Sequence, residues 1–249
     1  MEKSTFLIIG KHAVVEALKN SRRKVTKIYI NEHVHKEINR SNQPKNIFQK
    51  TKVIFKSKKE LDNLCGRDQI NHQGIVGEVL ELDNNSLKSD LEFLNKENIN
   101  FLALENISDP RNLGSIIRSA ASFNIDGIIV NERKFPNKSK LLYKAASGAM
   151  EHINIYRLSN IKVAFNLLKK KGFWISAFSS HAEKSFTTNN WKGKNILLFG
   201  SEGKGLKKNT KEKADFYYKI NIKNIESLNV SNSVSIVCHF INEKISQKI

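Results

Sequence analysis

The sequence predicts an α/β protein with a small N-terminal domain and a larger C-terminal domain built on a parallel sheet. Residues 101–130 have the pattern of a buried strand, a polar loop, a helix and a second buried strand. Short apolar runs then alternate with helical patterns, which is typical of a parallel sheet covered on both faces. The polar stretch at 81–100 contains Leu-Asp-Asn-Asn-Ser and is typical of a linker. We therefore expect domains at 1–85 and 99–249, joined by a linker at 86–98.

The charge balance favours a polyanionic partner. Lys and Arg number 42 and Asp and Glu number 24, so the net charge is +18. Basic proteins gain affinity for nucleic acid because each neutralised phosphate releases condensed counterions. An anionic membrane is the competing interpretation, but the sequence contains no lipidation signal and its apolar runs are too short to span a bilayer. These features favour nucleic acid and no membrane partner.

The cysteines and the N-terminus bear on the cellular compartment. Cys65 and Cys238 are the two cysteines, and neither lies in a CxxC or His-flanked ligand pattern. This usage indicates a reducing compartment and argues against a disulfide framework or a metal site. The opening residues, Met1 to Ser4, are not followed by a signal-peptide pattern. We expect a cytoplasmic protein.

The N-terminal domain alternates strands and helices. A strand at 6–9 precedes a helical pattern that contains Val14 and Leu18, and Ser57 is expected to cap a short helix ending near Leu64. The other expected elements are a strand at 24–30, a helix within 31–52, and strands at 53–55 and 74–80. The domain carries two basic clusters, which are either solvated faces or nucleic-acid contacts: Arg22, Arg23, Lys24 and Lys27, and Lys52, Lys56, Lys58 and Lys59.

The unit at 101–130 holds the first candidate site. After the strand at 101–104 we expect a polar loop at 105–112 and then a helix with Leu113, Ile116, Ile117 and Ala120 on its buried stripe. Pro110, which lacks a backbone donor, fits the loop better than a helix interior. Arg118 falls off the apolar stripe one turn after Gly114, where a ligand can approach the helix closely. An ordinary solvated arginine explains the same spacing.

The remaining elements continue the alternation. We expect helices at 138–149 and 161–171 and strands at 153–156, 173–179, 196–199 and 217–222. The strand at 196–199 runs into a glycine-rich loop at 200–206 that has neither GxxxxGK[ST] nor GxGxxG spacing, and a plain turn is the alternative interpretation. Ser227 is a candidate N-cap for a final helix that starts at Leu228 and carries Val234, Val237, Cys238 and Ile241 at helical spacing.

Three motifs resemble the signatures of one family in the right order. The pattern Asn106-x-x-Asp109-Pro110-x-Asn112-x-Gly114-x-x-x-Arg118-x-Ala120 resembles the first signature of the SpoU/TrmH family of RNA 2'-O-ribose methyltransferases, within the SPOUT superfamily. Residues 197–206 resemble the second signature and residues 226–231 the third. The chain departs from the family at Asn232–Ser235, which replaces a small apolar run.

The N-terminal domain carries two further matches. Gly10 to Leu18, with the pattern GxHAVxEAL, and Asn71 to Val76 resemble the two ends of the family's substrate-binding domain. Larger members carry this domain, notably the 23S rRNA guanosine 2'-O-methyltransferases, whereas the shorter tRNA enzymes usually lack it.

The resemblance implies a SPOUT domain with a trefoil knot, S-adenosylmethionine as cofactor, no metal, and a homodimer whose site includes residues of both subunits. The implied catalytic residues are Arg118, Asn112, Glu202, Ser227 and Asn229. The implied cofactor contacts are Leu104, Asn106, Gly200, Gly205, Leu228 and either Ile220 or Ile222. The candidate RNA contacts are Lys11, His12, Arg22, Arg23, His72 and Arg111, with a structural role as the alternative for His72.

The function that this resemblance implies is methylation of a ribose 2'-hydroxyl in RNA, with a guanosine of 23S rRNA as the expected target. A tRNA 2'-O-methyltransferase and a non-catalytic rRNA-binding module on the same scaffold are the alternatives. A pure binding module does not need the polar set Asn112, Arg118, Glu202 and Asn229.

Overall fold

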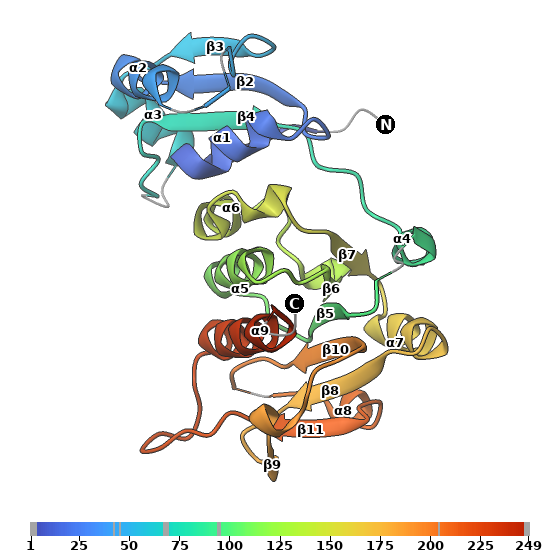
Figure 1. The fold of residues 1–249 in the computed structure, drawn as a ribbon. Helices are drawn as coiled ribbons and strands as arrows, with labels where there is room; N and C mark the ends of the chain where they lie inside the picture. Colours follow the sequence, from blue (N-terminus) through green and yellow to red (C-terminus); the bar gives the residue numbers. More distant parts are fainter. Residues whose placement is uncertain are drawn as a thin grey trace. The chain divides into compact units, whose positions relative to one another are not determined.

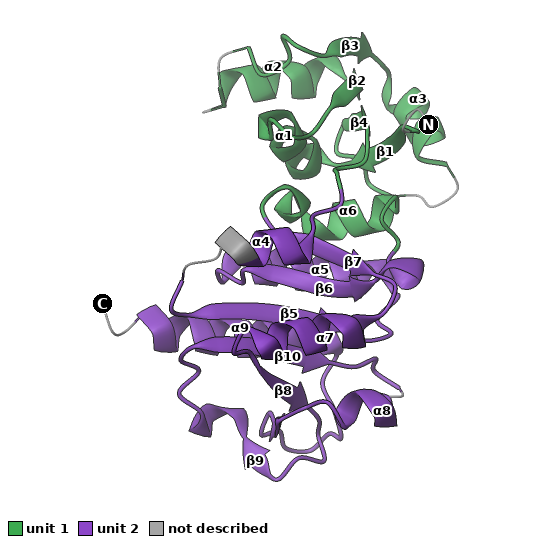
Figure 2. Cartoon of the chain, turned by 90° about the vertical axis from the view of Figure 1, so that its right-hand side faces the viewer, with its two compact units in different colours: residues 1–83, 136–152 green, residues 84–135, 153–249 purple. Residues whose placement is uncertain are grey.

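The computed structural model describes residues 4–41, 43–44, 46–66, 70–93, 96–203 and 205–246. Two compact units make up the chain (Figure 2). Unit 1 contains residues 1–83 and 136–152, and unit 2 contains residues 84–135 and 153–249. Parts of the expected linker (residues 94 and 95) and of the second motif (Lys204) lie outside the described residues.

Unit 1 is built on a four-stranded sheet in the order β1-β4-β2-β3. Strands β1 and β2 both pair antiparallel with β4, and β2 pairs parallel with β3. The predicted elements of this domain are present: β1 (Phe6–Ile9), α1 (Lys11–Lys19), β2 (Val25–Ile30), α2 (Glu32–Arg40), β3 (Lys52–Phe55), α3 (Lys58–Cys65) and β4 (Ile75–Val79).

Side-chain caps fix where two of these helices begin. The Asn31 side chain accepts a hydrogen bond from the Val34 amide at the start of α2. Ser57 caps α3 as predicted, and Glu60 completes a capping box with it. Hydrogen bonds from Lys56 and from Ser57 lower the pKa of Glu60 to about 2.

Residues 136–152 belong to unit 1, although the sequence assigns them to the C-terminal domain. They form α6 (Lys140–Ala146) and the 3-10 turn η3 (Ala149–Glu151), which pack against β1 and α1. Leu141 covers a core cluster of unit 1 that includes Ile9, Leu61 and Val76.

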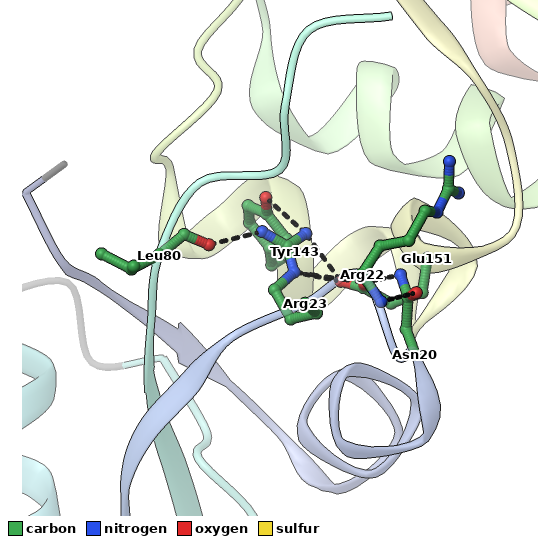
Figure 3. Close-up of polar contacts among 6 residues, drawn as sticks. All are labelled: Asn20, Arg22, Arg23, Leu80, Tyr143 and Glu151. Carbon is green, nitrogen blue, oxygen red and sulfur yellow. Dashed lines mark hydrogen bonds and ion pairs between the residues drawn. The ribbon is translucent and has the colours of Figure 1, made fainter.

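A buried ion pair ties this segment to the rest of unit 1 (Figure 3). The Arg23 guanidinium donates to the Glu151 carboxylate at 2.7 Å, and both side chains are almost wholly buried. Arg23 also donates to the Leu80 carbonyl at 2.9 Å and to the Tyr143 hydroxyl at 3.3 Å. Asn20 donates to the second Glu151 oxygen at 2.7 Å, so both carboxylate oxygens have partners.

Unit 2 is built on a seven-stranded sheet in the order β7-β6-β5-β10-β8-β11-β9, and every pairing within it is parallel, as predicted. Helices α5 and α9 lie on one face of the sheet, and α4 and α7 lie on the other (Figure 1). The strands are β5 (Ile99–Leu104), β6 (Gly127–Asn131), β7 (Ile155–Leu158), β8 (Trp174–Phe178), β9 (Lys184–Ser185), β10 (Lys194–Phe199) and β11 (Phe216–Lys219). The helices are α4 (Leu87–Phe93), α5 (Pro110–Ser122), α7 (Ile161–Lys170), α8 (Lys208–Lys211) and α9 (Val230–Ser246), with short 3-10 turns η2 (Glu132–Lys134) and η4 (Phe186–Thr188).

Two helix starts differ from the predictions. Helix α5 begins at Pro110, whose missing N–H costs nothing in the first turn, and Asp109 caps it by accepting from the Arg111 amide at 3.1 Å. Asn112 therefore lies on the helix and not in the preceding loop. Helix α9 begins at Val230, and Asn229 caps it in place of Ser227 by accepting from the Ser231 amide at 2.9 Å.

None of the helices in the described part of the chain combines the length and apolar character that a bilayer crossing requires. The trefoil knot is not established by the strand order and stays a prediction.

Removing one member of the buried ion pair is expected to destabilise unit 1 strongly. Glu151→Ala leaves the Arg23 guanidinium buried without a counter-charge, a change that typically costs about 3–5 kcal/mol. Urea unfolding, together with hydrogen exchange over residues 136–152, measures this loss.

The matched control is Lys19→Ala, which removes a partly exposed pair with Glu16 and is expected to cost no more than about 1 kcal/mol. Equal effects of the two substitutions would show that the buried pair has no special role.

Candidate active site

The candidate site forms at the carboxyl ends of neighbouring parallel strands of unit 2. Strands β5 and β10 pair along their whole length, with Phe199 opposite Leu104. Strand β8 pairs with β10 and with β11. The segments that follow β5, β8, β10 and β11 therefore meet at one edge of the sheet, where open α/β sheets bind their ligands.

Glu202 joins the three sequence motifs. Its Oε1 atom accepts hydrogen bonds from the Asn112 side chain at 3.3 Å, from the Val230 amide at 3.2 Å and from the Asn229 side chain. The Asn229 side chain also donates to Asn112 Oδ1 at 3.1 Å. Asn112, Glu202 and Asn229, predicted from separate motifs, thus form one hydrogen-bonded cluster.

The glycine-rich loop after β10 depends on a close backbone approach. The Gly205 amide donates to the Ser201 carbonyl at 2.8 Å, and Gly205 has a φ of 58°. A methyl group built at Gly200 would lie 2.3 Å from the carbonyl carbon of Gly205. Only glycine fits at position 200, because a Cβ there would clash with backbone atoms, which cannot rotate out of the way as a side chain can.

Glu105 holds the far end of this loop and was not singled out from the sequence. Its carboxylate accepts from the Lys207 amide at 2.8 Å and from the Thr210 hydroxyl at 2.6 Å. Glu105 is 8% exposed and Thr210 is 2% exposed. Its position directly after the apolar run of β5 could have identified Glu105 from the sequence. A carboxylate at the end of a buried strand is costly unless it has hydrogen-bond partners, so such partners are expected.

A cavity of about 310 Å³ lies at this edge of the sheet. Phe178, Phe199, Leu206, Ile220, Ile222 and Leu228 line it with apolar groups, and Glu202, Glu226 and Ser227 line it with polar ones. Gly200 and Gly205 contribute backbone. Ile220 and Ile222 both line the cavity, so both remain candidate cofactor contacts.

Other predicted site residues lie outside the cavity lining. Leu104 is buried within β5. Asn106 has a φ of 57°, and its side chain accepts from Lys134 Nζ at 2.6 Å. Arg111 and Arg118 are exposed on α5, and the Arg118 side chain forms no hydrogen bond or ion pair with any described residue.

The candidate RNA contacts of unit 1 divide into exposed and buried side chains. His12 is exposed, and Arg22 is exposed with its side chain turned away from the ion pair of Figure 3. Lys11 is partly exposed and donates to Glu37 at 2.6 Å. Arg23 and His72 are 5% exposed.

The two buried side chains have structural partners instead of an open surface. Arg23 is held by Glu151, as described above. His72 Nδ1 accepts from the Gly74 amide at 2.8 Å, and its Nε2 lies 3.1 Å from Asp62 Oδ1. We therefore remove Arg23 and His72 from the candidate RNA contacts.

Comparison with known families agrees with the site geometry. Residues 100–239 match the SpoU rRNA Methylase family, and residues 7–84 match the substrate-binding domain of RNA 2'-O ribose methyltransferases. The chain belongs to the SpoU family. Two SpoU-family relatives each cover 95% of this chain and are covered to 95% by it. They are a putative TrmH family tRNA/rRNA methyltransferase, YacO of Bacillus subtilis, at 30% identity, and the 23S rRNA (guanosine-2'-O-)-methyltransferase RlmB of Coxiella burnetii, at 31%.

Solved structures of a SpoU methyltransferase and of an RNA 2'-O ribose methyltransferase share the fold. AviRb from Streptomyces viridochromogenes, crystallised with AdoMet, matches with a TM-score of 0.79 at 16% identity over 97% of this chain and 91% of that one. A crystal structure described as an RNA 2'-O ribose methyltransferase matches with a TM-score of 0.79 at 20% identity over 98% of this chain and 90% of that one. The predicted fold class is thereby confirmed.

Adding a single methyl group at Gly200 is expected to disrupt the loop. Gly200→Ala forces its Cβ against the Gly205 backbone, and overpacking of this kind typically costs about 1–3 kcal/mol. A fall in the thermal unfolding midpoint measures the change.

Gly203→Ala is the control in the same loop. A Cβ at Gly203 meets no atom within 4 Å, so this variant is expected to unfold like the wild type. The proposed constraint fails if the two variants behave alike.

Proposed function

We propose that this chain transfers a methyl group from S-adenosylmethionine to a ribose 2'-hydroxyl of RNA. The observation that carries the proposal is the hydrogen-bonded cluster of Asn112, Glu202 and Asn229, formed beside a cavity that Glu202 itself lines. Membership of the SpoU family supports the same reaction.

The chemistry of the cavity fits this cofactor. S-adenosylmethionine combines an apolar-faced adenine with a cationic sulfonium and a polar amino-acid end. The cavity volume of about 310 Å³ lies in the range of small-molecule sites. The isoleucines and Leu228 suit the adenine, and the Glu202 and Glu226 carboxylates provide negative charge for the cationic groups. Leu104 and Asn106 do not line the cavity, and we omit them from the proposed contacts.

The bound cofactor supplies an activated methyl group on its sulfonium. Transfer would break the bond between that methyl and sulfur, leaving a neutral thioether, and would pass the ribose hydroxyl proton to solvent water. The residues around the ribose oxygen would then stabilise its developing negative charge. A guanidinium is a poor base, because its pKa lies above about 12. Arg118 therefore orients the 2'-oxygen and stabilises its charge. Asn112, Asn229 and Ser227 complete the polar shell, and Glu202 fixes the two asparagines.

A homodimer is part of the proposal. Arg118 lies outside the cavity lining, and its side chain forms no hydrogen bond or ion pair with the described residues. We propose that a second copy of the chain brings this arginine to the cofactor site, so that each site contains residues of both subunits. Sedimentation equilibrium tests the assembly, and a monomer with full activity would refute it.

The proposed substrate is a guanosine of 23S rRNA, methylated in the cytoplasm. Support comes from the match at 7–84 to a substrate-binding domain and from the 31% identity to RlmB over nearly the whole chain. A tRNA substrate is the second candidate, because the Bacillus subtilis relative is described as acting on tRNA or rRNA.

Tritiated methyl transfer tests the function and the substrate together. Ribosomal RNA and tRNA from cells lacking this chain are each incubated with the purified protein and labelled S-adenosylmethionine. We expect label in the large-subunit rRNA. Label in tRNA alone would replace the substrate assignment, and cofactor binding without label in either RNA would favour a non-catalytic binding module.

Replacing Arg118 is expected to separate catalysis from cofactor binding. Arg118→Ala removes the group that faces the ribose oxygen, and methyl transfer should fall by about 100-fold or more, the usual loss when a donor to a developing oxyanion is removed. Cofactor affinity, measured by calorimetry, should stay close to that of the wild type. Parallel loss of both quantities, or of neither, would contradict the assigned role.

A further inference from the structure

Lys144 lies beside Gly10, where β1 leads into α1 near the start of the family's substrate-binding domain. It is carried by α6, within residues 136–152 of unit 1. The match to the substrate-binding domain covers residues 7–84, so Lys144 falls outside the region to which RNA binding is assigned by sequence similarity.

The ammonium group is positioned by two loops of unit 1. Lys144 Nζ donates to the Gln73 side-chain oxygen at 2.6 Å, and the same oxygen accepts from the Lys11 amide at 3.2 Å. A methyl group built at Gly10 would lie 2.8 Å from Lys144 Nζ. The absence of a side chain at Gly10 therefore lets the ammonium group lie directly against the start of α1.

Among the described residues, Lys144 has no carboxylate partner, unlike the nearby cations Lys11, Arg23 and Lys19. Lys11 is paired with Glu37 at 2.6 Å, Arg23 with Glu151 at 2.7 Å, and Lys19 with Glu16 at 2.8 Å. Among the described residues, the Lys144 ammonium has only the neutral Gln73 amide as a hydrogen-bond partner. Burial lowers the pKa of Lys144, the direction expected for a half-buried cation without an acidic neighbour.

We propose that Lys144 binds a backbone phosphate of the RNA substrate, together with the first turn of α1, where His12 is exposed and Lys11 is partly exposed. This inference rests on the proposed function. An ammonium group has three donors, and Gln73 occupies one of them, so the others remain for phosphate oxygens. The first turn of α1 contains no acidic residue that would repel the phosphate. A phosphate contact of this kind positions the RNA without reading its sequence.

A purely structural role is the alternative: Lys144 would then serve only to attach α6 to Gln73. The salt dependence of RNA binding separates the two roles. Each phosphate contact contributes about 0.9 to the slope of log affinity against log salt concentration, whereas a structural hydrogen bond contributes nothing to it.

The experiment uses the full-length protein and a fluorescein-labelled stem-loop from 23S rRNA, with anisotropy titrations over a range of KCl concentrations. Lys144→Gln is expected to weaken binding several-fold and to reduce the slope by about 1. Lys144→Arg keeps the charge and should keep the slope. Gln73→Glu places a carboxylate against the Lys144 ammonium and retains the hydrogen bond between them, so it should also reduce the slope. This second variant tests the proposal even if Lys144→Gln folds poorly.

Lys170→Gln is the charge-matched control, because Lys170 is exposed on α7 of unit 2. It should leave the slope unchanged. A wild-type slope in Lys144→Gln and Gln73→Glu, or an equal loss in Lys170→Gln, would overturn the assignment of Lys144. Methyl transfer by the wild type on rRNA and tRNA is measured in parallel, and its absence from both would overturn the proposed function instead.

Discussion

The site depends on one carboxylate oxygen that receives three hydrogen bonds. Glu202 Oε1 collects donors from α5, from the residue before α9 and from the first amide of α9, positions that are 90 and 27 to 28 residues away in the chain. Without it the glycine-rich loop would lose its hydrogen bonds to the other two motifs, which would stay joined by the Asn229 to Asn112 hydrogen bond alone. Glu202 itself is placed by the tight loop that Gly200 permits. Glu105 holds the exit of that loop through the Lys207 amide and Thr210, so two carboxylates fix the glycine-rich segment from its two sides.

Much of the fold follows from local patterns in the sequence. Most strands of both sheets are short apolar runs bounded by polar residues, and most helices carry apolar stripes, so periodicity predicts their sequence along the chain. The short polar elements β9 (Lys184–Ser185) and α8 (Lys208–Lys211) have no such pattern and were not predicted. Helix starts were harder to predict because several side chains near each start are capable of capping. Asp109 and Asn229 make the observed contacts, and a capping serine two residues before Asn229 was an equally reasonable choice. The meeting of the three motifs was predicted from the family resemblance and not from periodicity, and each motif contributes one polar member to the cluster around Glu202.

Contacts between distant residues explain what the sequence did not predict. Arg23 and Glu151 are 128 residues apart, and no local pattern marks either of them as half of a buried pair. The sequence pattern therefore does not separate two neighbours in the basic cluster at 22–24, of which Arg22 is exposed and Arg23 is enclosed. A net charge of +18 predicts the kind of partner and leaves open which cations face it. The same reasoning applies to Glu105, whose two partners lie more than a hundred residues away.

The path of the chain through the two units limits how proteolysis or gene fusion can separate them. The backbone passes between the units after residue 83, after residue 135 and after residue 152, so three covalent connections join them. A protease that nicks the linker leaves both units attached. A gene fusion that moves only residues 1–84 to another enzyme would lack Leu141 and expose the apolar cluster that it covers. Evolution can therefore exchange this N-terminal module intact only if an internal piece of the methyltransferase sequence moves with it.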